Sequence, residues 1–146
     1  MLQVLQNLST GETELVDVPR PASGPGKIVI ATRTTLVSAG TERMLVEFGK
    51  AGLISKARQQ PERVRQVLGK MRTDGVLQTI DTVRSKLGQP LPLGYCNVGV
   101  VLEIGADVSG FKVGDRVASN GGHAEVVSVG QNLVARIPDN VNDDAA

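Results

Sequence analysis

The hydrophobic period of this 146-residue chain changes twice, from that of a β-strand to that of a helix and back again. Short runs rich in β-branched residues lie near both ends, and clusters of Gly and Pro separate them, so each run is expected to end in a turn. The expected strands cover residues 2–8, 13–18, 27–37, 98–104, 116–118, 125–129 and 133–137. This pattern predicts a mainly β body, opened by a hairpin between the first two runs.

The middle of the chain, residues 43–89, has the spacing of amphipathic helices. Apolar residues recur at i, i+3, i+4 and i+7 at Val64, Val67, Leu68 and Met71. Pro61 stands where the first turn of a helix tolerates it. A second helix is expected between residues 76 and 87, and a shorter one around 44–48. The chain is therefore expected to be mainly β with a helical insertion, and α+β overall.

Charge divides along the same boundaries. The whole chain has a formal net charge of +1, from 16 Lys+Arg against 15 Asp+Glu. Residues 43–89 hold ten basic and four acidic residues, a net +6, which leaves six basic and eleven acidic residues, a net −5, elsewhere. Aromatic residues are only 2% and Trp is absent, so the stacking platform of a nucleic-acid binder is missing. The basic helices are expected to be solvated or to pack on a partner, with steering of an anionic substrate as a third interpretation.

The cysteine content and the apolar runs favour a protein of a reducing compartment. Cys96 is the one cysteine, so it forms no internal disulfide. The first residues lack a basic and apolar leader, and no apolar run approaches the roughly 20 residues of a membrane-spanning helix. We therefore expect a cytoplasmic protein that does not enter a membrane.

Three ordered motifs carry a resemblance to a known family. The stretch from Gly105 to Val117, GADVSGFKVGDRV, holds two Gly and Asp turns between strands. Together with GGHAEV at 121–126 and LVARIPD at 133–139, it resembles the N-terminal, GroES-like domain of medium-chain dehydrogenases/reductases. The resemblance covers the chain outside the helical segment and implies a partly open β-barrel. SAGTE at 38–42, GYCN at 94–97 and the extra helices look most like the bacterial bi-domain oxidoreductases of the threonine/alcohol dehydrogenase-like group.

The metal-ligand positions of that family are changed in this chain. Zinc-dependent members have a Cys-Gly-Thr-Asp-like tetrapeptide and a later Gly-His-Glu, whereas this sequence reads AGTE at 39–42 and GYC at 94–96. Ala39 cannot bind a metal, Tyr95 is a poor zinc ligand at neutral pH, and one thiolate from Cys96 is too little for a site. The resemblance therefore implies a zinc-independent branch, and no metal is expected.

The same motifs give the candidate catalytic residues Thr41, Tyr95 and Glu42. Thr41 matches the proton-relay hydroxyl of the family, Tyr95 can donate to a substrate carbonyl, and Glu42 can orient Thr41 or act as a base. Each has a structural alternative. Thr41 can cap a helix, Tyr95 can close the barrel with its ring, and Glu42 can be a solvated carboxylate at a helix start.

Ser38, Asn97 and Cys96 are the candidate substrate-binding residues, because they flank those positions. Polar residues near turns usually satisfy backbone groups, and lone cysteines are usually small buried hydrophobes. His123 stands where the family usually has an aromatic residue, and we expect it to be packed or to lie on a strand surface.

No Gly-x-Gly-x-x-Gly occurs in the chain, so no dinucleotide-binding residue is predicted in it. Residues 1–146 are expected to be one GroES-like domain, with its helical insertion at about 43–89, followed in the whole enzyme by a Rossmann domain that binds NAD or NADP. Alone it is expected to be inactive. The expected reaction is hydride transfer to or from a carbonyl, alcohol or enone, with a sugar or sugar nucleotide among the candidate substrates.

The alternative function is a non-catalytic GroES-like module that docks a partner through the basic helical insertion. The expected partners of the enzyme are a small-molecule substrate, which an anionic group would suit, and its own Rossmann domain. A homo-oligomer is left open, and neither nucleic acid nor membrane is expected as a partner.

Overall fold

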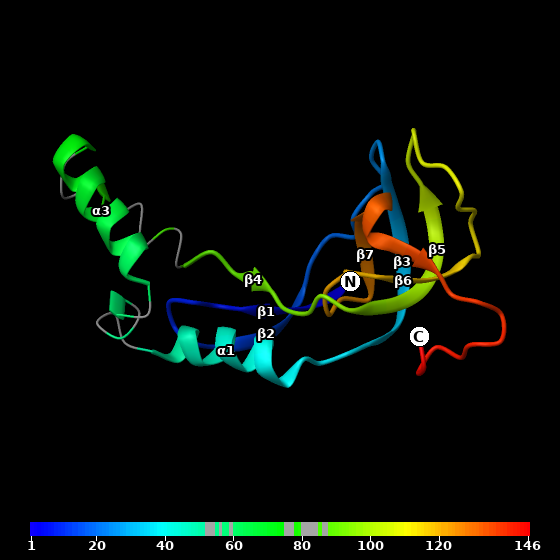
Figure 1. Ribbon diagram of the computed structural model, residues 1–146, viewed down its shortest axis with the longest axis horizontal. Coiled ribbons are helices and arrows are strands. Elements are labelled where there is room, and N and C mark those ends of the chain that lie inside the picture. The colour runs from blue at the N-terminus through cyan, green and yellow to red at the C-terminus, as the bar shows by residue number, and fades with distance from the viewer. Residues whose placement is uncertain (52–54, 56, 59, 75–77, 80–84, 86–87) are drawn as a thin grey trace. The chain divides into compact units, whose positions relative to one another are not determined.

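The computed structural model describes residues 1–51, 55, 57–58, 60–74, 78–79, 85 and 88–146 (Figure 1). The chain divides into two compact units. The β unit comprises Met1–Leu5, Glu14–Glu42 and Pro92–Ala146, and the helical unit comprises Gln6–Thr13 and Arg43–Leu91.

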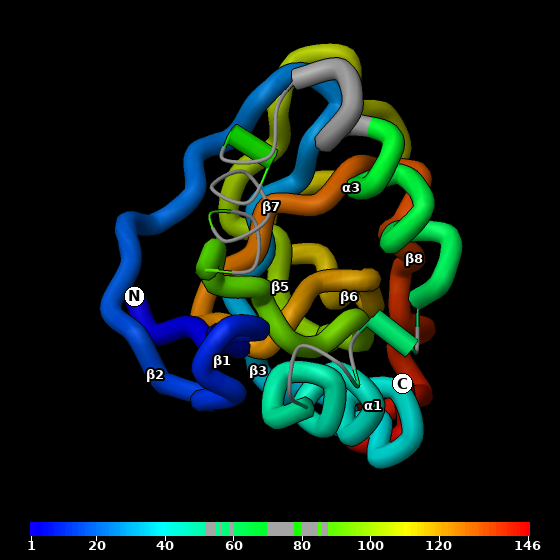
Figure 2. The backbone as a smooth tube through the Cα atoms, turned by 90° about the vertical axis from the view of Figure 1, so that its left-hand side faces the viewer, coloured from blue at the N-terminus to red at the C-terminus, as the bar shows by residue number. Residues whose placement is uncertain are grey.

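The main sheet of the β unit has five strands in the order β7-β3-β5-β6-β8. Each neighbouring pair is antiparallel. The strands are β3 (Lys27–Thr35), β5 (Asn97–Ile104), β6 (Arg116–Ser119), β7 (Val126–Gly130) and β8 (Val134–Arg136). In Figure 2, β5, β6 and β8 lie in that order across the view, as they do in the sheet. The five corresponding predictions from sequence are confirmed to within two residues at either end.

A second sheet has the order β2-β1-β4, formed by β1 (Leu2–Gln6), β2 (Thr13–Asp17) and β4 (Leu91–Pro92). The neighbouring β1 and β2 confirm the predicted opening hairpin. Within the β unit, β1 also meets the segment before β7: Gln3 bridges Ala124, and the Val4 N–H donates to the His123 carbonyl at 2.9 Å. Among the described residues these strands close no barrel, so the mainly β, α+β fold with a partly open barrel is confirmed.

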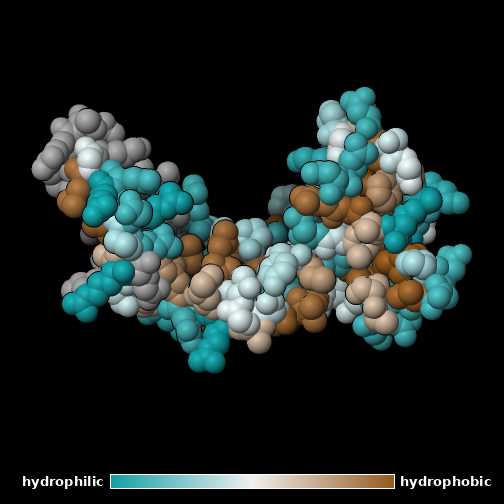
Figure 3. All heavy atoms as spheres, viewed as in Figure 1, coloured by the Kyte–Doolittle hydropathy of each residue, from teal (hydrophilic) through white to brown (hydrophobic). Residues whose placement is uncertain are grey.

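β3 has a paired neighbour on each side and holds three consecutive residues that are fully buried. Ile28, Val29 and Ile30 are each 0% exposed. The alternating residues Ile28 and Ile30 join a cluster of small apolar side chains from β5, β6, β7 and the segment before β7: Val101, Val117, Ala124, Val127 and Val129. A core of this kind suits a chain with few aromatic rings. Hydrophobic side chains also gather over the strands of this unit in the space-filling view (Figure 3).

Two helices are described over their whole length, α1 (Ala39–Lys50) and α3 (Pro61–Asp74). α3 confirms the helix predicted to begin at Pro61. α1 begins five residues before the short helix expected around 44–48, because the Ser38 carbonyl accepts the Glu42 N–H at 3.0 Å and closes a first turn. Most of the helix predicted between 76 and 87 lies outside the described residues.

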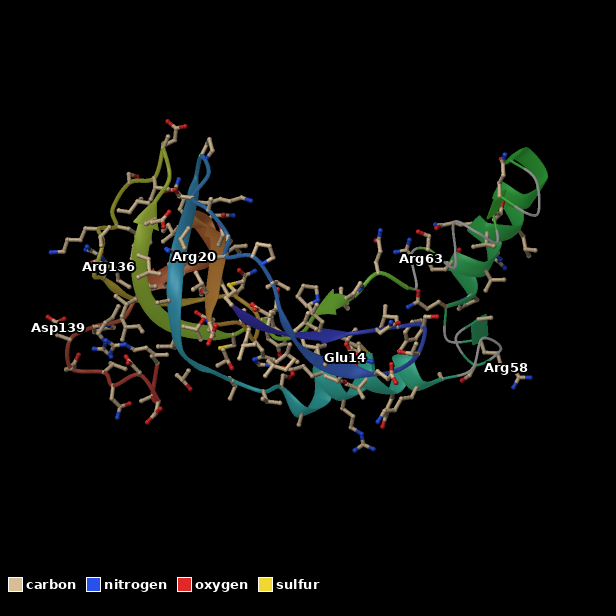
Figure 4. The ribbon with its side chains drawn as sticks, turned by 180° about the vertical axis from the view of Figure 1, so that it is seen from behind. Glu14, Arg20, Arg58, Arg63, Arg136 and Asp139 are labelled. Carbon is tan, nitrogen blue, oxygen red and sulfur yellow. The ribbon has the colours of Figure 1, made fainter. Side chains whose placement is uncertain are left out.

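The helical unit exposes basic side chains, and Arg58 and Arg63 project from its surface in Figure 4. None of the helices in the described part of the chain combines the length and the apolar character needed to cross a membrane.

Candidate functional site

Three hydroxyl groups meet in the β unit, and we call Ser38, Thr41 and Tyr95 the hydroxyl cluster. Ser38 immediately precedes α1, Thr41 lies in its first turn, and Tyr95 lies in the loop before β5. Hydrogen bonds from the side chains of Ser38 and Thr41 lower the pKa of Tyr95, against an opposing effect of the Glu42 charge. The ring is 49% exposed. The cluster therefore presents a polarised phenol that a small molecule can reach.

Thr41 is not the N-cap of α1, since it lies inside the helix. Ser38 occupies the cap position, and its N–H donates to Glu42 Oε1 at 3.0 Å. This contact works as a capping box does, with the acidic residue one position farther along the helix. The capping interpretation is therefore wrong for Thr41, and its hydroxyl instead helps to lower the pKa of Tyr95.

Glu42 is a buried carboxylate, only 7% exposed, so the solvated alternative is also wrong. Its Oε1 accepts from the Ser38 N–H, and its Oε2 lies 2.9 Å from His123 Nε2. Burial raises the pKa of Glu42, but the hydrogen bonds from Ser38 and His123, together with the charge of His123, outweigh it and leave the pKa lowered. Glu42 is therefore held as a carboxylate.

His123 completes a line of three side chains, which we call the inner chain: Glu42, His123 and Thr35. The imidazole Nδ1 lies 2.8 Å from Thr35 Oγ1 at the end of β3, while Nε2 faces Glu42. The side chain is 10% exposed, and its backbone N–H donates to the Leu93 carbonyl at 2.8 Å. Sequence reasoning gave this residue no role. The available signal was that it is the only histidine in the chain.

Gly94 makes room for the imidazole beneath the loop that carries Tyr95. Its φ is +89°, a conformation that side chains disfavour. A Cβ at this position would lie 2.7 Å from the His123 backbone nitrogen and 2.8 Å from the Cγ of its ring. The Gly-Tyr pair of the sequence therefore places a phenol and accommodates a histidine at the same time.

The other two candidate residues, Asn97 and Cys96, are not part of the hydroxyl cluster or the inner chain. Asn97 is 0% exposed, its Nδ2 donates to Thr32 Oγ1 at 2.7 Å, and its Oδ1 has no partner among the described residues. Cys96 is half-buried and lines a recess of about 250 Å³ with Thr35 and Leu36. Of the six candidates, the structure brings together Ser38, Thr41, Glu42 and Tyr95. Asn97 is fully buried, so a substrate cannot reach its side chain in this structure.

The donor set of the site does not fit zinc. In the described ranges, no three side chains of His, Cys, Asp or Glu come close enough together to hold a metal ion. Ala39 offers no donor atom, and the Glu42 and His123 groups that could ligate are turned toward each other at 2.9 Å.

The described strands also do not offer a dinucleotide site. The pairs of the five-stranded sheet are antiparallel, whereas a phosphate cradle needs a parallel βαβ unit with a glycine-rich turn. The described residues therefore do not fit the phosphates of NAD or NADP.

Comparison of the sequence with known proteins identifies similar sequences. The profile of the alcohol dehydrogenase GroES-like domain matches residues 65–139, just over half of the chain. L-threonine 3-dehydrogenase of Marinomonas sp. is 35% identical over 65 residues, which cover 42% of this chain and 19% of that protein. The chain thus spans about a fifth of the curated relative that it matches.

Solved structures share the fold. Quinone oxidoreductase of Escherichia coli, in complex with NADPH, has a TM-score of 0.64 at 11% identity, covering 99% of this chain and 35% of its own. 2R,3R-butanediol dehydrogenase of Bacillus subtilis has a TM-score of 0.63 at 16% identity, covering 99% and 42%. Quinone oxidoreductase of Pseudomonas syringae has a TM-score of 0.58 at 22% identity, covering 99% and 36%.

Proposed function

Because the chain belongs to the alcohol dehydrogenase GroES-like domain family, the N-terminal part of medium-chain dehydrogenases/reductases, we propose that it forms the substrate side of an NAD(P)-dependent oxidoreductase that works without zinc. The observation that carries the proposal is the hydroxyl cluster. Its phenol, Tyr95, is half-exposed, and two neighbouring hydroxyls lower its pKa. By the resemblance of the GYC motif, this residue corresponds to a ligand position of the zinc-dependent members.

The steps that belong to this chain are proton steps. In the direction of reduction, Tyr95 donates its O–H proton to the substrate oxygen, and Ser38 and Thr41 stabilise the phenolate oxygen that remains. In the direction of oxidation, the same oxygen accepts the proton of an alcohol. The hydride chemistry would come from a nicotinamide bound by residues other than those described.

Exposed apolar side chains lie next to the hydroxyl cluster in the chain. They are suited to contact a bound substrate and to exclude water from it. Leu36 is 66% exposed and Val37 is 65% exposed, and both directly precede Ser38. A carbonyl, alcohol or enone carbon is the proposed reacting centre, and a sugar or sugar nucleotide is a proposed substrate. Attraction of an anionic substrate by the basic helical unit, a bi-domain organisation and a cytoplasmic setting belong to the same proposal.

The test is turnover by the natural protein that contains this chain. NADH and NADPH oxidation would be followed with quinones, ketones, aldehydes and sugar nucleotides. Tyr95→Phe is expected to lower kcat by roughly 10²- to 10⁴-fold, the usual contribution of a positioned acid. Leu68→Ala, on the exposed surface of α3, is the control.

Two results would contradict the proposal. Absence of turnover with both nucleotides would favour the non-catalytic module that docks a partner through the basic helices. One tightly bound zinc per chain by mass spectrometry, with activity that a chelator removes, would overturn the zinc-independent chemistry.

A further inference from the structure

The two hydrogen-bonded groups of the β unit share one residue. Glu42 belongs to the inner chain through Oε2 and reaches the hydroxyl cluster through Oε1, which accepts from the Ser38 N–H at 3.0 Å. His123 also contacts the loop that carries Tyr95: its backbone N–H donates to the Leu93 carbonyl at 2.8 Å, and Gly94, the residue before Tyr95, packs against its ring. Ser38 is in addition the main cause of the lowered pKa of Tyr95. We propose that His123 is the positioning residue of the site: through Glu42 it fixes Ser38 and the first turn of α1, and thereby holds the Tyr95 hydroxyl in place for proton exchange. The catalytic part of this proposal rests on the proposed function.

The chemistry of the inner chain fixes the proton on the imidazole. An ionised carboxylate only accepts hydrogen bonds, so the 2.9 Å contact requires that His123 Nε2 carries a proton and donates to Glu42. In the neutral ring Nδ1 then has a lone pair and accepts from the Thr35 hydroxyl, 2.8 Å away. Glu42 and Thr35 together therefore select one tautomer and one orientation of the ring.

The surroundings leave the ring little freedom to turn. Both ring nitrogens are satisfied, the side chain is 10% exposed, and the backbone is tied to Leu93 and Val4 on either side. Gly94 packs against the ring where any larger residue would clash. If His123 were lost, Glu42 would keep only the Ser38 N–H, and a buried carboxylate without its second donor is costly. It would then move, and Ser38 would move with it.

Other ionisable groups act on the same phenol and belong in the interpretation of any titration. Besides Glu42, Cys96 opposes the lowering of the pKa of Tyr95. Neither group is changed in the variants below, so a difference between those variants reports the contact made at position 123.

The composition of the chain allows two direct measurements. It has one histidine, one tyrosine and no tryptophan, so each signal belongs to one residue. In the unmodified full chain, ¹⁵N chemical shifts of the imidazole, recorded at a pH at which the ring is neutral, are expected to show the Nε2–H tautomer. The Nδ1–H tautomer would overturn the proposal, whatever the variants do.

A matched pair of variants separates positioning from packing. The amide nitrogen of Gln reaches the place of Nε2 and can donate to Glu42, whereas the shorter Asn reaches only the place of Nδ1. Phenolate absorbance of the full chain is expected to titrate as in the unmodified protein for His123→Gln. For His123→Asn the midpoint is expected to move up toward that of an ordinary tyrosine. Equal midpoints in both variants, with circular dichroism showing both folded, would overturn the proposal.

Turnover by the natural protein that contains the chain gives the catalytic readout. His123→Asn is expected to lower kcat on the order of 10- to 100-fold, the effect of misplacing a reacting group, with KM changed less than about twofold. His123→Gln is expected to restore most of kcat. Wild-type kcat in His123→Asn would overturn the inference and leave the proposed function intact. No turnover in the unmodified protein would overturn the proposed function, and the tautomer and the phenol titration would still decide the inference.

Discussion

Each of the two units is stabilised internally by a different kind of contact. Every buried hydrophobic side chain among the described residues lies in the β unit, with Ile28, Val29 and Ile30 at its centre. The buried described positions of the helical unit are two polar residues, Gln6 at 0% and Thr79 at 4% exposure, and the glycines Gly11 and Gly49. Leu68 on α3 is 54% exposed.

Close backbone packing takes the place of apolar burial in the described part of the helical unit. The Gln6 side chain accepts from the Thr13 hydroxyl and lies against Gly49 of α1, where a Cβ would approach its Nε2 to 2.6 Å. Burial of apolar surface is the main favourable contribution to folding. We therefore expect the stability of the described chain to depend on the β unit, which also carries the site.

The largest expected effect tests the core of β3. Ile30→Ala removes most of a fully buried side chain and leaves a cavity between β3, β5 and β7. The free energy of unfolding is expected to fall by about 2–5 kcal/mol. Urea denaturation followed by circular dichroism measures it. A loss below 1 kcal/mol would contradict the assignment of stability to this core.

An intermediate effect is expected at Glu42, where the site and the stability of the β unit meet. Glu42→Gln is expected to cost about 1.5–3 kcal/mol at pH 7, because hydrogen bonds to a charged group are lost. The pKa of Glu42 is lowered in the folded state, so its contribution is present above the unfolded pKa, about 4.3, and is lost as the pH falls through the folded value.

The measurement is the difference in unfolding free energy between wild type and Glu42→Gln at pH 7 and at successively lower pH. The difference is expected to shrink on acidification below about pH 4, because a protonated Glu42 and a Gln then resemble each other. The pKa values of Asp17, Asp115 and Asp143 are also lowered, but these residues are the same in both proteins. Their contributions therefore cancel in the difference between the two unfolding free energies. A difference that stays constant with pH would show that Glu42 is not held as a carboxylate.

The smallest effect is expected in the helical unit. Leu68→Ala trims an exposed side chain from α3 and should change the free energy of unfolding by less than about 0.5 kcal/mol. The same urea titration measures it. A loss approaching that of Ile30→Ala would remove the contrast between the two units.

The strands and α3 followed from local patterns, because period and turn chemistry are written in neighbouring residues. The β-branched run along residues 27–37 and the Gly and Asp turns after residue 104 each act over a few positions. The start of α1 did not follow in this way. Ser38 and Glu42 close its first turn through a side-chain contact that a hydrophobic period does not record.

The candidate site was likewise predictable from the sequence only in part. The AGTE and GYC motifs singled out Thr41, Glu42 and Tyr95, because each stands at a position that carries chemistry in the resembling family. Whether Glu42 was solvated or buried depended on His123, which is 81 residues away in the chain.

The sequence by itself determined the class of fold, the family and the hydroxyl groups available for a proton, because these depend on residue types and short spacings. Only the tertiary structure decided that Glu42, His123 and Thr35 form one hydrogen-bonded line. It did so by bringing the end of β3, the start of α1 and the segment before β7 together. The physical reason is that a hydrogen bond depends on distance in space, and the pairing of strands far apart in the chain sets that distance.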